Sequence, residues 1–242
     1  MSWQDTYRSL GYALIAGAAP RNLLVTMRSH ADQVRARFPD IEEQNSLNFV
    51  GDRTFHEIVK SERFLDLIRP LLGEDLLHFY SRYFQKPPHT DASIPLHQDG
   101  GNDYSLEPNE FVTLWIALDD ASLANGCMWV MPGTHRGQLL PVEPLPPNYW
   151  RISQVAVGSE VLAAATVPLE VNAGAVVLMH PKLVHGSGPN RSDTWRRALA
   201  IRYINVTTRI LRKLRFGIEW ECAFLVHGSS QGCQNRLINS PP

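Results

Sequence analysis

Residues 95–100 read Pro-Leu-His-Gln-Asp-Gly and place a histidine and an aspartate two positions apart, between an apolar run and a glycine pair. In an extended strand, side chains at positions i and i+2 point to the same face. His97 and Asp99 would then project together, with Gln98 on the opposite face. The alternative is a surface turn in which Asp99 hydrogen-bonds its own backbone and His97 is solvated. A third metal ligand elsewhere in the chain would favour the first interpretation.

The stretch 180–197, HPKLVHGSGPNRSDTWRR, supplies a candidate for that third ligand. His185 closes a strand-like run and is followed by a glycine turn. Two neutral imidazoles and one carboxylate make a facial set that suits Fe(II) and leaves three coordination positions open. Open positions indicate chemistry, because a structural metal site is usually closed by four protein ligands. The sequence therefore predicts a catalytic iron site at His97, Asp99 and His185.

Three stretches, PLHQDG, LANGCMWVMPGTHRG and LVHGSGPNRSDTWRRALAIRY, resemble the phytanoyl-CoA dioxygenase (PhyH) family of Fe(II)- and 2-oxoglutarate-dependent oxygenases. The resemblance runs from about Leu10 to Asn205. It implies a double-stranded β-helix, which is a cupin-like jelly roll. It also implies Fe(II) as cofactor, with 2-oxoglutarate and dioxygen as cosubstrates, and it assigns the metal to His97, Asp99 and His185.

The same resemblance predicts the residues at the 2-oxoglutarate site: Gln98, Trp115, Ser187 and Arg196. A planar guanidinium can grip the far carboxylate of a dicarboxylic acid through two parallel hydrogen bonds. Arg197, the neighbour of Arg196, would point to the opposite face of the same strand. Only one of the two can face inward, and the family spacing of eleven residues after His185 selects Arg196.

Two further histidines are interpreted as structural. His180 lies an odd number of residues from His185, so in a strand it should face the other way. His135, in PGTHRG, is interpreted as a loop histidine, because the set of three ligands is complete without it.

The chain of 242 residues is predicted to form a single domain with a sizeable core. Its 23 basic and 24 acidic residues nearly cancel, so we expect no general preference for nucleic acid or anionic membranes. The three cysteines form no Cys-x-x-Cys pair, which suits a reducing compartment. We see no signal peptide and no uninterrupted apolar window long enough for a membrane span. A cytoplasmic protein is the expectation.

The apolar pattern predicts helices early in the chain and strands later. Residues 1–20 indicate a strand and a turn, whereas the segment after Pro20 and residues 52–72 have helical spacing. After Gly73 the sequence changes to short β-type runs: LLHFYSRYF, FVTLWIAL, GCMWVMPG, AVVLMH and ALAIRYINV. These patterns predict a mainly β fold with flanking N-terminal helices. Its expected parts are a helical part at about 1–74, a jelly-roll core at about 75–207 and a C-terminal extension at 208–242.

Substrate recognition is expected on loops at the barrel rim, because the iron and cosubstrate residues are set by the chemistry. The candidate segments are 44–51, 101–108 and 141–155, and residues 139–171 are predicted to form a long proline-bearing loop. In the third segment, three residues offer large amphipathic surfaces and a charge: Tyr149, Trp150 and Arg151. The expected substrate is a small metabolite or natural-product intermediate, and the expected outcome is hydroxylation of an unactivated C–H bond with release of succinate and CO2.

Several other functions share part of this residue pattern. Desaturation, epoxidation and cyclisation use the same ligands. A halogenase usually has a small residue where Asp99 stands. A zinc or manganese hydrolase could use the same three ligands without requiring Arg196, and a non-catalytic jelly-roll binding module would tolerate loss of Asp99. No Gly-x-Gly-x-x-Gly follows a strand, which disfavours a nucleotide-binding sheet. The HGSG at 185–188 has the wrong spacing for the nucleophile elbow of a serine hydrolase.

Overall fold

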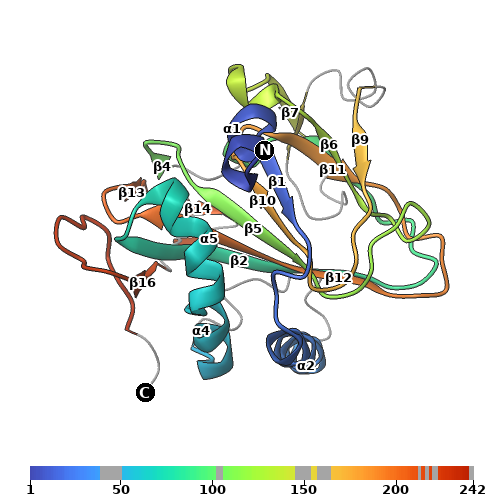
Figure 1. Cartoon of the computed structure of the whole chain (residues 1–242), viewed down its shortest axis with the longest axis horizontal. Coiled ribbons are helices and arrows are strands. Elements are labelled where there is room, and N and C mark those ends of the chain that lie inside the picture. Colours follow the sequence, from blue (N-terminus) through green and yellow to red (C-terminus); the bar gives the residue numbers. More distant parts are fainter. Residues whose placement is uncertain are drawn as a thin grey trace.

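The computed structural model describes residues 1–38, 51–101, 106–144, 154–156, 165–211, 214–215, 218–219 and 223–239. Its described strands form a six-stranded and a four-stranded antiparallel sheet, together with three two-stranded ribbons (Figure 1). Apolar side chains from both larger sheets form one buried cluster, which includes Trp115, Val177, Val130 and Leu183. The mainly β, jelly-roll prediction is confirmed.

The larger sheet has the strand order β1-β10-β5-β12-β2-β16. In that order its strands are Tyr12–Ile15, Val176–Met179, Val112–Ala117, Arg196–Asn205, Leu76–Lys86 and Phe224–His227. Both edge strands come from segments that the sequence placed outside the jelly-roll core. The helical N-terminal part therefore also supplies β1, and the C-terminal extension supplies β16.

The smaller sheet has the order β3-β11-β6-β9. Its strands are Ile94–His97, Val184–Ser187, Met128–Met131 and Val167–Leu169. The ribbons pair β4 (Leu106–Glu107) with β13 (Arg209–Ile210), β14 (Leu214–Arg215) with β15 (Ile218–Glu219), and β7 (Val142–Pro144) with β8 (Gln154–Ala156).

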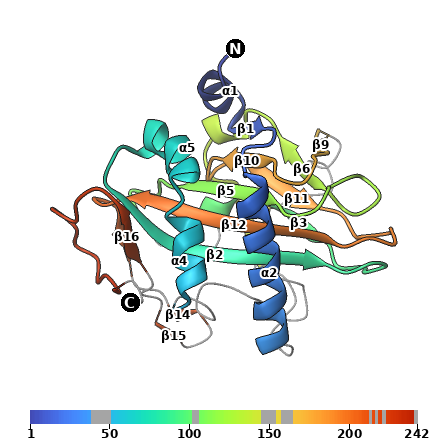
Figure 2. The same ribbon diagram turned by 60° about the horizontal axis from the view of Figure 1, so that its bottom comes forward.

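The helices are α1 (Trp3–Leu10), α2 (Arg21–Arg37), α4 (Arg53–Val59) and α5 (Glu62–Leu72). Figure 2 shows α2, α4 and α5 lying across one face of the larger sheet. Apolar residues of these helices pack there against every second side chain of the sheet, including Leu114, Ile116, Leu199 and Ile201. The alternate side chains of the same strands point into the barrel, which is where the candidate site lies.

The helix after Pro20 is confirmed, but two other expectations need correction. The pattern at 52–72 is two helices, since the chain turns at Lys60 and Asp52 and Ser61 each start a new helix. The strand and turn expected in residues 1–20 is wrong for its first half, which is helix α1. A capping box explains the difference, because Ser2 and Asp5 satisfy each other's backbone N–H groups at the helix start.

The five predicted β runs are all strands. The long loop expected at 139–171 is wrong in part, because β7, β8 and β9 fall within it. Pro144 is accommodated at the end of β7, in a two-stranded ribbon and outside the central strands. Among the described residues, no helix is long and apolar enough to cross a membrane.

Candidate metal centre

Asp99 is positioned by a short turn and not by an extended strand. Strand β3 ends at His97, and Asp99–Gly101 form a 3-10 turn, so the extended geometry expected for the pair is wrong. The turn is held by the N–H of Gly100, which donates to the carbonyl of Pro181 at 2.8 Å. A Cβ atom at Gly100 would lie 3.2 Å from Pro181 Cβ, so a larger residue would crowd the turn that presents Asp99.

The third predicted ligand lies directly across from the first. His185 on β11 is the Cα register partner of His97 on β3, and the two imidazole centroids are 4.3 Å apart. One ligand atom from each of His97, Asp99 and His185 can be chosen so that all three lie within 4.8 Å of one another. All three residues are buried. The structure thus brings together the three residues that the sequence singled out.

Both histidines direct the same ring nitrogen toward the centre. Nδ1 of His97 lies 2.9 Å from the carbonyl of Pro95, and Nδ1 of His185 lies 3.0 Å from the carbonyl of Leu183. A carbonyl can only accept, so each Nδ1 carries a proton and each Nε2 is the nitrogen available to a metal. Nε2 of both rings faces Asp99 Oδ1, at 3.6 and 3.9 Å. This hydrogen bonding is typical of metal-ligating histidines.

The charge states also suit a cation. Burial alone would raise the pKa of Asp99, but the positive charge of Arg202 holds it well below its usual range. Burial, followed by repulsion from His97, lowers the pKa of His185 to about 4. At neutral pH the site therefore offers an anionic oxygen together with a neutral imidazole, the protonation states that a metal requires.

Arg196 points into the barrel and Arg197 points out of it, as the parity of the strand predicts. Nε and Nη2 of Arg196 donate to the carbonyl of Gly126, at 3.1 and 2.8 Å. Burial lowers the pKa of Arg196 to about 10, which leaves it charged at neutral pH. Among the described residues, no carboxylate forms an ion pair with it. Arg197 instead binds Asp119 at 2.7 Å.

The inner wall between Arg196 and the metal site is built of small residues. Strand β12 alternates, and its inward positions read Arg196, Ala198, Ala200 and Arg202. Trp115 on β5 is the register partner of Ala200 and contributes to the same inner cluster. Two alanines thus lie on this strand between the two inward-facing arginines, Arg196 and Arg202.

A sequence model of the phytanoyl-CoA dioxygenase family matches residues 7–198. The chain belongs to that family. It is 30% identical over 198 residues to a probable phytanoyl-CoA dioxygenase of Caenorhabditis elegans, an alignment that covers 77% of this chain and 62% of the relative. It is 34% identical over 155 residues to a probable alpha-ketoglutarate-dependent hypophosphite dioxygenase of Stutzerimonas stutzeri, covering 60% of this chain and 51% of the relative. The chain thus spans about three fifths or less of the length of these two curated relatives.

The fold has a similar solved counterpart. The apo structure of the non-heme monooxygenase ThoJ matches with a TM-score of 0.75 at 23% identity, covering 99% of this chain and 88% of that one. A match at this identity supports the fold. The fold of this chain is therefore also found in a non-heme monooxygenase.

Two other positions expected at the family's cosubstrate site are engaged by the protein. Ser187 Oγ accepts a hydrogen bond from Lys86 Nζ at 2.9 Å. The Gln98 amide donates to the carbonyl of Lys182 at 2.6 Å and accepts from the N–H of Leu140 at 2.7 Å. Gln98 therefore ties the turn between the metal ligands to two neighbouring loops.

Three polar residues of the inner wall were missed by the sequence reasoning: Lys86, Thr113 and Arg202. Lys86 is the register partner of Arg196 across β2 and β12, so the two buried cations are neighbours. Thr113 and Arg202 both bind Asp99. Arg202 lies six residues, an even number, after Arg196. The alternation of side chains along a strand could therefore have indicated that Arg202 also faces inward.

The residues interpreted as structural or as substrate-binding lie elsewhere. His180 packs against His135 with centroids 5.3 Å apart, and His135 Nε2 lies 3.0 Å from the carbonyl of Arg8 in helix α1. Both belong to the contact between the N-terminal helix and the barrel. The predicted substrate residues of the rim loop fall outside the described residues: Tyr149, Trp150 and Arg151.

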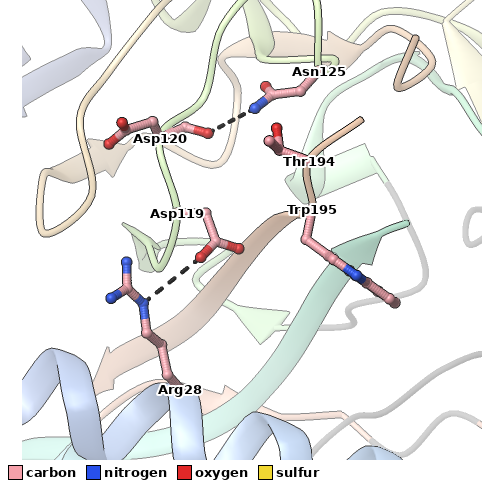
Figure 3. A pocket seen from close by; sticks show the side chains of 6 residues that line it. All are labelled: Arg28, Asp119, Asp120, Asn125, Thr194 and Trp195. Atoms are coloured by element: carbon pink, nitrogen blue, oxygen red, sulfur yellow. Dashed lines mark hydrogen bonds and ion pairs between the residues drawn. The ribbon is translucent and has the colours of Figure 1, made fainter. Parts of the chain in front are cut away.

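A surface cavity of about 330 Å³ lies apart from the metal triad. It is lined by Arg28, Asp119, Asp120, Asn125, Thr194 and Trp195, none of which is a predicted ligand (Figure 3). Its polar groups are engaged by the protein, since Asp119 binds Arg197 and Asn125 donates to the carbonyl of Asp120 at 2.8 Å. Of the two, the triad is the candidate active site, because it combines metal-ligating atoms with shifted pKa values and the cavity does not.

Proposed function

We propose that the protein is a non-haem Fe(II)- and 2-oxoglutarate-dependent dioxygenase. One observation carries the proposal: a buried triad of two histidines and an aspartate shares the barrel interior with a buried arginine that pairs with no carboxylate among the described residues. Family membership and the name of the Stutzerimonas relative support it. A hydrolase with the same triad would have no use for the arginine.

The triad residues would hold the iron. His97 and His185 would bind it through Nε2, while Pro95 and Leu183 keep the Nδ1 protons in place. Asp99 would bind through Oδ1, the oxygen nearest both histidines. Iron bound in this way supplies oxidative chemistry that uses dioxygen and a 2-oxo acid, and the protein's task is to position the reactants and exclude water.

Arg196 would anchor the far carboxylate of 2-oxoglutarate. A buried charge is normally paired, and among the described residues the guanidinium of Arg196 donates hydrogen bonds only to one backbone carbonyl. An incoming carboxylate would supply the missing partner. Trp115 and the two alanines of β12 would form the wall along which the cosubstrate lies, and Ser187, held by Lys86, would lie at the same end as Arg196.

We further propose that the substrate is a small metabolite or natural-product intermediate and that the outcome is hydroxylation of an unactivated C–H bond, with succinate and CO2 as coproducts. Desaturation, epoxidation and cyclisation are the alternatives on the same ligands. Substrate contacts are assigned to the rim, with Trp150 and Arg151 as the residues to test. Trp150→Ala and Arg151→Ala should impair substrate oxidation while uncoupled succinate formation persists, and native kinetics in both would exclude this loop.

The cytoplasm is the proposed compartment. Cys127 and Cys233 are free thiols, and Cys127 is buried beside the inner wall. Unpaired thiols suit a reducing environment.

The proposed function is tested by anaerobic titration. Fe(II) and 2-oxoglutarate are added to metal-free protein, and the visible charge-transfer band of the iron chelate is followed. A saturable band, followed by succinate release on admission of air with a metabolite library, would support the proposal. Metal binding without any chelate band or succinate would indicate a hydrolase, and absence of metal binding would indicate a binding module.

A further inference from the structure

The two carboxylate oxygens of Asp99 have different surroundings. Oδ2 accepts hydrogen bonds from Nε and Nη2 of Arg202, at 3.2 and 2.8 Å, and from the hydroxyl of Thr113 at 3.1 Å. Oδ1 faces the Nε2 atoms of His97 and His185, at 3.6 and 3.9 Å. One oxygen is therefore held by the protein, and the other is directed at the centre of the triad.

The groups that hold Oδ2 come from the larger sheet. Arg202 and Thr113 are register partners on β12 and β5, which are central strands of the larger sheet. Arg202 is 4% exposed, and its guanidinium carbon lies 5.0 Å from the ring centroid of Tyr80. The histidines come from the smaller sheet. Asp99 is thus clamped between the two sheets, and its orientation is set by strands that do not carry the other ligands.

We propose that Arg202, assisted by Thr113, is a positioning residue that restricts Asp99 to binding the metal through one oxygen. The inference rests on the proposed function and concerns how that site keeps its open positions. A carboxylate can bind a metal through one oxygen or through both. With Oδ2 saturated by three donors, Asp99 can offer only Oδ1.

The number of coordinating oxygens decides how many positions remain for other ligands. Two histidines and a one-oxygen carboxylate leave three positions of an octahedral metal open. A two-oxygen carboxylate would leave two, which a chelating 2-oxo acid would fill completely. By occupying Oδ2, Arg202 preserves the third position for the other cosubstrate. It therefore acts on the reaction through Asp99 without touching the metal.

The test compares Arg202→Met, Arg202→Lys and Thr113→Val with the wild-type protein. Each variant is loaded with Co(II), whose ligand-field absorption reports coordination number and needs no turnover. We expect Arg202→Met to change this spectrum and to weaken 2-oxoglutarate binding to the metal-loaded protein by about tenfold or more, the scale on which partners of metal ligands act. Lysine, which keeps the charge but not the two-pronged contact, should restore part of the loss. Thr113→Val should shift the spectrum in the same direction by less.

Arg197→Met is the matched control, because it removes a salt-bridged arginine from the same strand but from the opposite face. Its Co(II) spectrum should be native. If Arg202→Met does not fold, the lysine and valine variants carry the comparison. Native Co(II) spectra and native 2-oxoglutarate affinity in the folded variants would overturn the inference. If the wild-type protein binds Co(II) but no 2-oxoglutarate, the proposed function fails, and the Co(II) spectra alone then decide whether Arg202 restricts Asp99.

Discussion

The protein contains two groups of buried histidines, and only one of them can hold a metal. His97 and His185 lie in the barrel with Asp99. The second, helical group lies on the other face of the larger sheet and consists of His30 in helix α2, His56 in helix α4 and His78 on strand β2, all at most 4% exposed. Among the residues that the structure describes, the barrel group alone brings three ligand atoms within 4.8 Å of one another.

The second group is separated by aromatic rings. His56 stacks on Phe224 with centroids 4.1 Å apart, and His78 lies 4.6 Å from the same ring. His30 Nδ1 is 2.6 Å from the Tyr83 hydroxyl, and His78 Nε2 is 2.8 Å from Ser81 Oγ. These rings serve as aromatic packing with local hydrogen bonds. His30 Nε2 also faces a carboxylate, Asp52 Oδ2 at 3.6 Å, but among the described residues no third ligand atom joins this pair. The comparison teaches that one histidine beside one carboxylate is not enough, and that a metal site needs a second imidazole converging on the same oxygen.

The largest effect should come from removing a barrel ligand. Asp99→Ala and His185→Ala are expected to abolish turnover and to weaken metal binding by more than the about 10- to 100-fold that outer partners cost. His78→Asn, in the helical group, should leave metal affinity unchanged. Metal titration by calorimetry on folded protein makes the measurement. Wild-type turnover by a triad variant at matched iron occupancy would remove the assignment.

The next largest effect is expected on the 2-oxoglutarate requirement, when Arg196, the buried cation in the barrel, is removed. Arg196→Ala should raise the 2-oxoglutarate requirement far more than Arg197→Ala does, because Arg197 pairs with Asp119 on the opposite face. Losing one partner of a buried, hydrogen-bonded charge pair costs about 2 to 5 kcal/mol, which is more than tenfold in affinity. The 2-oxoglutarate dependence of succinate formation is measured for both variants. The reverse ranking would show that Arg197 is the anchor.

The buried His78 of the helical group should make the free energy of unfolding of the metal-free protein depend on pH in the acid range. Burial, followed by repulsion from His56, lowers the pKa of His78 to about 3. In the unfolded chain a histidine titrates near 6.5, so between these values the unfolded state binds more protons. The free energy of unfolding should therefore fall as pH decreases below about 6.5, and this histidine contributes a slope of about 1.4 kcal/mol per pH unit.

Urea unfolding of chelator-treated protein between about pH 6 and about pH 4.5 measures this slope. His78→Asn should flatten it by close to one proton's contribution, whereas Asp99, whose pKa is held below its usual range, acts only at lower pH. Equal slopes in the variant and the wild type would show that His78 is not buried in its neutral form.

The smallest effect is expected at a surface histidine. His89 Nε2 lies 2.8 Å from Asp193 Oδ1, with the side chains 66% and 95% exposed. Exposed ion pairs contribute about 0 to 1 kcal/mol. His89→Asn, chosen because asparagine tolerates the positive φ of 55° at this position, should change stability by less than about 1 kcal/mol and leave metal affinity native. A larger loss in thermal unfolding would show that the His89–Asp193 pair contributes to stability beyond a weak surface contact.

Much of the candidate site follows from local rules. The three candidate ligands and the candidate anchor arginine can be picked out from the sequence, and the period of two in a strand separates Arg196 from Arg197. The same rules gave wrong predictions at two places, where the local structure is not the strand that they assumed. Asp99 shares a side with His97 because of a glycine-permitted turn, and helix α1 forms because Ser2 and Asp5 cap it.

The sequence by itself determined which donor atoms are available and on which face of each strand they lie, because the pleat of a strand repeats over two residues. Only the tertiary structure decided which of the histidines converge and which oxygen of Asp99 faces them. His97 meets His185 through the pairing of β3 with β11, and Asp99 meets Arg202, 103 residues away, through the packing of two sheets. Such contacts depend on strand register and sheet packing, which are set by the whole core and leave no periodic signal near either residue.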